Sequence, residues 1–141
     1  MQSNKREFLP RTRFRSDLID EALRKLHLAV TGLKASVVVN RDGLLVASFP
    51  PGDEDALLSP TSSPQVAAMS ATLIGLAERT LERLDQGGLK RLMMEGDDGI
   101  MVVYPAGRAT LAVLVGKDAQ MSRVLYGTQK TAQDVADVLE S

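Results

Sequence analysis

The sequence contains no cysteine and no tryptophan, one histidine, and only three phenylalanines and two tyrosines. The absence of cysteine excludes disulfides and thiolate chemistry, which favours a cytoplasmic compartment. The scarcity of aromatic rings argues against a base-stacking surface, so nucleic acid is not an expected partner. No apolar run approaches the roughly 18 residues that a membrane span needs. The N-terminus also lacks the apolar core of a signal peptide.

The sequence also lacks the residue combinations that carry catalysis or metal binding. His27, the single histidine, cannot be matched to a serine by spacing, so a packed or surface role is expected for it. Asp53-Glu54-Asp55 matches no calcium loop and is interpreted as a solvated acidic turn. Gly87-Gly88 follows a predicted helix, whereas a phosphate-binding loop precedes one. We therefore expect no catalytic residue, no metal, no cofactor and no enzymatic activity.

What the chain does contain is an ordinary apolar content with an uneven distribution of charge. Its 141 residues are 44% hydrophobic, which suits one domain with one core. The net charge of −1 combines five basic residues and Glu7 in residues 1–15 with 12 basic and 17 acidic residues in the remainder. We predict a basic, flexible arm over residues 1–15 and a single domain over 16–141. A solubilising leader is the favoured role for the arm, and docking on an acidic partner, nucleic acid or a membrane stays open.

Hydrophobic periodicity predicts three helices and five strands. Val37–Val39 and Leu44–Ala47 flank the turn sequence Asn40-Arg41-Asp42-Gly43, which is typical of a hairpin. The predicted elements are a helix from Ser16 or Asp17 to Thr31, strands 35–39 and 44–49, a loop 50–63, a helix from Pro64 to Gln86 capped by Ser63, strands 90–95, 100–104 and 109–115, and a helix capped by Asp118.

This order predicts an α/β protein of the α+β type, α-β-β-α-β-β-β-α. The short connections indicate antiparallel pairing, and the apolar character of the first and fifth strands places them together in a sheet of order 2-1-5-4-3. Apolar residues on both faces require helices on both sides. We predict the first and last helices on one face and the second helix on the other.

The second helix has an apolar arc too wide for a helix that only covers its own sheet. Two adjacent rows make up this arc, namely Val66, Met69, Leu73, Leu76 and Leu84, and Ala67, Ser70, Ile74, Ala77 and Leu81. One row should cover the sheet and the other needs a second partner. A subunit interface is preferred to deep burial within a monomer.

The chain resembles the roadblock family, the dynein light-chain-like regulators of small GTPases, over about residues 17–139. The resemblance is carried by residues 18–23 (LIDEAL), 37–48 (VVVNRDGLLVAS), 66–84 with Leu76-Ala77-Glu78-Arg79, and 110–115 (TLAVLV) with Val124-Leu125-Tyr126. It implies a homodimer in which the second helices pack together and the third strands pair. The implied interface residues are Met69, Leu73, Leu76, Thr80, Leu92 and Met93.

The resemblance further implies a non-enzymatic adaptor that binds a Ras-like small GTPase and modulates its nucleotide cycle or localisation, as bacterial members do. We expect its contact surface to include Glu78, Arg79, Glu82 and Arg83, for which a solvated helix face with local ion pairs is an equally good interpretation. The basic arm and the long loop 50–63 depart from the family pattern. The alternatives are a small-molecule or signal-sensing module, which an apolar cavity between the sheet and the final helix would favour, and a docking scaffold that uses the arm.

Overall fold

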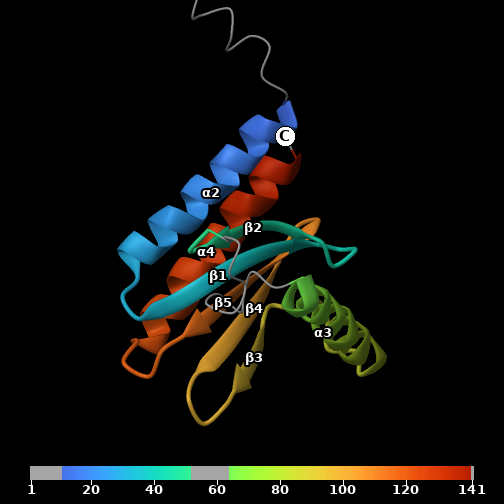
Figure 1. The fold of residues 1–141 in the computed structure, drawn as a ribbon. Helices are drawn as coiled ribbons and strands as arrows, with labels where there is room; N and C mark the ends of the chain where they lie inside the picture. The colour runs from blue at the N-terminus through green and yellow to red at the C-terminus, as the bar shows by residue number, and fades with distance from the viewer. Residues whose placement is uncertain (1–10, 52–63, 141) are drawn as a thin grey trace, which may run out of the picture.

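The computed structural model describes residues 11–51 and 64–140. Within them the chain forms α2 (Arg11–Ala29), β1 (Leu33–Asn40), β2 (Leu45–Phe49), α3 (Pro64–Arg83), β3 (Leu92–Glu95), β4 (Ile100–Ala106), β5 (Ala109–Val115) and α4 (Met121–Glu140) (Figure 1). The acidic turn at Asp53–Asp55, the Ser63 cap and residues 1–10 of the predicted arm lie outside the described residues. The division of the chain at residue 15 stays a prediction.

The sheet has the predicted topology. Its strand order is β2-β1-β5-β4-β3 and all of its pairings are antiparallel. The hairpin of β1 and β2 joins the three-strand meander through β1 and β5, where Val37 pairs with Ala112. The predicted pairing of the first and fifth strands is therefore confirmed.

The helices cover the two faces of the sheet as predicted (Figure 1). Leu111 and Val113 of β5 belong to the core cluster that also contains Leu23 of α2 and Val124 of α4. Ala112, between them in the sequence, belongs to the cluster on the opposite face, which contains α3 residues. This alternation follows from successive side chains pointing to opposite faces of a strand.

Several element boundaries differ from the predictions. The predicted helix start at Ser16 or Asp17 is wrong, because α2 begins at Arg11. Arginine is a good helix former and the sequence places a proline directly before Arg11, which favours a helix start. The helix predicted to reach Gln86 ends at Arg83.

The ends of β4 and α4 also differ, for identifiable reasons. β4 continues through Pro105, which was expected to close it. β3 reaches only as far as the pair Leu92–Val103, so the missing N–H of Pro105 breaks no bond to β3. At α4, the backbone N–H of Val124 donates to the carbonyl of Gln120 at 3.1 Å, so Gln120 caps this helix rather than Asp118.

α2 and α4 lie side by side, and α2 begins beside the end of α4 (Figure 1). Gly127 of α4 allows this close approach. A Cβ atom built on Gly127 would lie 2.7 Å from Cγ2 of Val30 and 3.3 Å from Cδ1 of Leu26, both on the α2 side. The contact between the two helices therefore depends on the absence of a side chain at residue 127.

Candidate functional site

The flank of α3 that faces β3 forms an apolar groove of about 450 Å³. Four of the six residues predicted for the dimer interface line this groove, namely Leu73, Leu76, Thr80 and Leu92. The remaining lining residues are Ala77, Leu81, Leu89 and Arg91. The structure therefore brings most of the predicted interface set together, from two elements that are separate in the sequence.

An exposed apolar row runs along the same flank of α3. Met69 and Leu76 of α3, and Leu84 directly after its last residue, leave 62%, 50% and 61% of their surfaces exposed. Their spacing repeats every three to four residues with Leu73 and Thr80, which places them on one side of a helix. Leu84 was not among the predicted interface residues, although its spacing of four residues from Thr80 indicates the same side of the helix.

Met93 lies on a different face from the other predicted interface residues. It pairs with Val102, whose side chain belongs to the core under α2 and α4, whereas Leu92 pairs with Val103 on the α3 side. Met93 is 43% exposed. Since β3 pairs with β4 alone among the described residues, its other edge presents free backbone groups. A strand added at this edge would contact Leu92 on one face and Met93 on the other.

The four charged residues predicted to contact a partner lie toward the end of α3. Glu78 accepts a hydrogen bond from Nη1 of Arg41 at 3.0 Å and is therefore already engaged. Arg79, Glu82 and Arg83 lie on the same turns of the helix, and none of them forms an ion pair with another described residue. No local ion pair therefore joins these four residues to one another, and the one ion pair among them links Glu78 to Arg41 of another segment.

Arg41 is a residue of this surface that sequence reasoning missed. It lies in the turn between β1 and β2, and its Nη2 also donates to the carbonyl of Gly107 at 3.4 Å. The side-chain oxygen of Asn40 accepts bonds from the backbone N–H groups of Asp42 and Leu44, at 2.9 and 3.0 Å, which holds the turn in shape. Because Arg41 and Glu78 are far apart in the sequence, no local pattern could have predicted the pair.

Gly43 completes this contact between the turn and α3. Its φ angle of +84° is accessible mainly to glycine, and a Cβ atom there would lie 3.1 Å from the Cα of Ala68. The turn therefore packs closely against the first turns of α3, while its Arg41 side chain reaches Glu78 further along the helix.

His27 has the packed role expected for it. Its Nε2 lies 2.9 Å from Oγ of Ser36, and its ring centroid lies 4.4 Å from that of Phe49. Partial burial lowers the pKa of His27 below its usual value. The histidine thus joins α2 to β1 and β2.

Among the described residues, no group of three or more His, Asp and Glu side chains is placed to hold a metal ion. In the same part of the chain, no helix is long and apolar enough to cross a membrane.

The described elements and sheet order are those of the roadblock fold, a small α+β domain. The family model of the Roadblock/LC7 domain matches residues 19–115. The chain belongs to the Roadblock/LC7 family.

Relatives and solved structures agree with this assignment. The uncharacterized protein MJ1340 of Methanocaldococcus jannaschii is 33% identical over 118 residues, which cover 84% of this chain and 96% of that protein. The Roadblock/LC7 domain from Streptomyces avermitilis superimposes with a TM-score of 0.74 at 24% identity, covering 86% of this chain and 98% of that one. The gliding protein MglB from Thermus thermophilus also gives a TM-score of 0.74, at 14% identity, covering 89% and 91% of the two chains. At these identities the structural likenesses show the fold.

Proposed function

We propose that this protein is a cytoplasmic, non-enzymatic homodimer that binds a Ras-like small GTPase and modulates its nucleotide cycle or localisation. The dimer is supported by the outer edge of β3, which pairs with no other strand among the described residues. This edge lies beside the exposed apolar row of α3. Water-exposed rows of this kind on a small domain are usually covered by another molecule. A second copy supplies the same edge and the same row, which suits a symmetric contact.

In this dimer, the two β3 strands pair along their free edges and the two α3 helices pack across the join. Leu73, Leu76 and Leu92 then lose contact with water, and Met69 and Leu84 extend the contact along the helices. The edge pairing satisfies backbone groups that the monomer leaves open to water. The same pairing extends the sheet from one protomer into its partner.

The dimer is tested by Leu76→Asp and its matched control, Leu28→Asp. Leu28 lies on α2 and is 73% exposed, so both substitutions place a carboxylate at an exposed leucine. An unpaired charge buried in an interface costs about 3–5 kcal/mol, so Leu76→Asp should weaken self-association at least about a hundredfold. Sedimentation equilibrium should give monomer for Leu76→Asp and dimer for wild type and Leu28→Asp. A monomeric wild type would contradict the dimer.

The GTPase proposal rests on family membership together with the charged end of α3. Arg79, Glu82 and Arg83 lie at this end of the helix, and the turn that contains Arg41 supports it. A rigid, charged surface of mixed sign suits a polar protein partner, because complementary charges steer association and select against wrong partners. We place the GTPase contact here.

Charge reversal tests the position of this contact. A bait carrying Arg79→Glu and Arg83→Glu should recover at least about tenfold less GTPase than wild type, since like charges would now face one another. Lys117→Glu is the control, because Lys117 is an exposed cation on a different segment, near Asp98. Equal recovery with all three baits would remove the charged end of α3 from the proposal while leaving the dimer untouched.

A further inference from the structure

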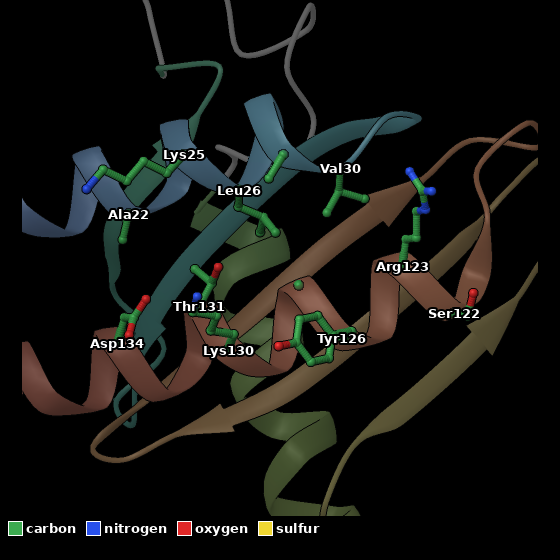
Figure 2. Close-up of a pocket in the computed structure, with 12 residues that line it drawn as sticks. Ala22, Lys25, Leu26, Val30, Ser122, Arg123, Tyr126, Lys130, Thr131 and Asp134 are labelled. Carbon is green, nitrogen blue, oxygen red and sulfur yellow. The ribbon is translucent and has the colours of Figure 1, made fainter.

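A second, mostly apolar groove lies between α2 and α4, on the opposite side of the sheet from α3 (Figure 2). Its volume is about 480 Å³. The apolar part of its lining consists of Ala22, Leu26, Ala29, Val30 and Gly127. Neither the dimer nor the GTPase contact proposed above uses this groove.

The walls of the groove include small residues from both helices. Gly127 lets α4 pack directly against Val30 and Leu26 at one end of the groove's apolar lining. Ala22 and Ala29 lie on either side of Leu26 in α2, and their short side chains leave the groove open on this side. Leu26 and Val30 are themselves almost fully buried, so they form a fixed apolar floor.

The charged residues around this apolar floor are mostly cationic. Lys25, Arg123 and Lys130 line the groove, against one carboxylate, Asp134. Figure 2 shows that the cations come from both helices. Arg123 and Lys130 form no ion pair with any described residue. This positive excess stands out on a chain whose net charge is −1.

We propose that this groove binds a small anionic amphiphile, a free molecule with an aliphatic body and a terminal carboxylate. The volume lies within the roughly 300–1,000 Å³ of small-molecule sites, which are typically apolar with a few polar groups that orient the ligand. The aliphatic body lies on Leu26 and Val30, and the carboxylate is attracted to the cations of α4. Tyr126, which lines the groove and is 74% exposed, can cover the aliphatic body with its ring.

The test uses the full chain and dodecanoate below its micelle concentration. Dodecanol and dodecyltrimethylammonium serve as controls with the same aliphatic length and a neutral or cationic end. Two-dimensional NMR should show saturable shifts of backbone amides in residues 22–30 and 122–134 with dodecanoate. The alcohol should bind more weakly than dodecanoate, and the cation should bind most weakly.

Two variants assign the effect to the groove. Ala29→Phe puts a ring into the space from an exposed position of α2 and should abolish the saturable shifts. The double variant Arg123→Gln/Lys130→Gln should weaken dodecanoate binding about three- to tenfold, as expected for two exposed charges, and leave dodecanol binding unchanged. Arg83→Gln, on the other side of the sheet, should bind dodecanoate like wild type.

Three outcomes would overturn the proposal. Equal binding of the three amphiphiles would show an apolar surface without preference for an anion. Saturable shifts confined to α3 and β3 would place the amphiphile in the other groove. A loss of self-association in Ala29→Phe would show that a second copy of the chain, rather than a small molecule, covers this face.

Discussion

His27 shows how one residue can set a pH dependence. Burial lowers its pKa in the folded chain, so between that pKa and the ordinary value of about 6.5 the unfolded chain binds more protons. Stability in that window therefore rises with pH. The contribution is complete above about pH 6.5 and is lost as the pH falls toward the folded-state pKa.

We predict that the melting temperature of the wild type falls when the pH is lowered from about 7.5 to 5.5. His27→Gln should reduce this change, because glutamine keeps hydrogen-bonding capacity toward Ser36 without titrating. The chain has no other histidine to titrate in this range. Differential scanning calorimetry at several pH values gives the comparison. An equal slope for both proteins would show that the pH dependence comes from other groups.

Single residues could be predicted from the sequence where their role depends on one element, and not where it depends on contacts between distant elements. The charged residues of α3 could be selected because they follow an apolar stripe along one helix. The ion pair between Glu78 and Arg41 depends on how the β1–β2 turn packs against α3. This is a tertiary contact, which local sequence patterns do not show. The opposite facing of Leu92 and Met93 was predictable, because neighbouring residues of a strand alternate between faces.

The helices carry two interior glycines in contrasting environments. Gly127 of α4 would place a Cβ atom 2.7 Å from Cγ2 of Val30, a stiff, β-branched side chain that is almost fully buried. Gly75 of α3 would place its Cβ atom only near Nη1 of Arg79, at 3.8 Å. The same substitution should therefore act in opposite directions at the two sites.

We predict that Gly75→Ala raises the free energy of unfolding by about 0.5–1 kcal/mol, through helix propensity alone. Gly127→Ala should lower it by about 1–3 kcal/mol, because crowding between α2 and α4 exceeds the same propensity gain. Urea unfolding of both variants measures the two changes. A stabilised Gly127→Ala would mean that α2 moves away without cost, which would contradict close packing of α2 and α4 at residue 127.

At the element scale, helices and strands were predictable from periodicity, and their ends were less so. The apolar rows of α3 predicted both its contact with the sheet and its exposed flank. The start of α2 at Arg11 differs from the prediction because the charge pattern of residues 1–15 indicates an arm, whereas their helix propensity extends the helix. The groove between α2 and α4 was also missed, because its existence depends on how closely two distant helices pack at Gly127. The sensing alternative predicted an apolar cavity between the sheet and the final helix, whereas this groove is lined by residues of two helices and the residue that follows α2.

The whole molecule presents separate surfaces on the two sides of one sheet. The α3 side carries the apolar row for self-association and the charged end assigned to a GTPase. The α2 and α4 side carries the groove assigned to an anionic amphiphile. Because the sheet separates these surfaces and each face packs its own core cluster, a surface on one face can be changed by substitution while those on the other face serve as internal controls.

A regulator of a nucleotide cycle must bind one nucleotide state of its GTPase more tightly than the other. A partner with equal affinity for both states cannot shift their populations, however tightly it binds. Preference for one state is therefore the property that separates regulation from simple tethering.

The most direct measurement is affinity capture from a lysate of the source organism on the wild-type protein, with a GTP analogue in one arm and GDP in the other, read by mass spectrometry. We predict that a Ras-like GTPase is recovered, with at least a severalfold preference for one nucleotide. The Arg79→Glu/Arg83→Glu bait in parallel should lose that protein specifically. Absence of any GTPase from both arms, with a dimeric bait, would contradict the proposed function and leave a roadblock scaffold with a different partner.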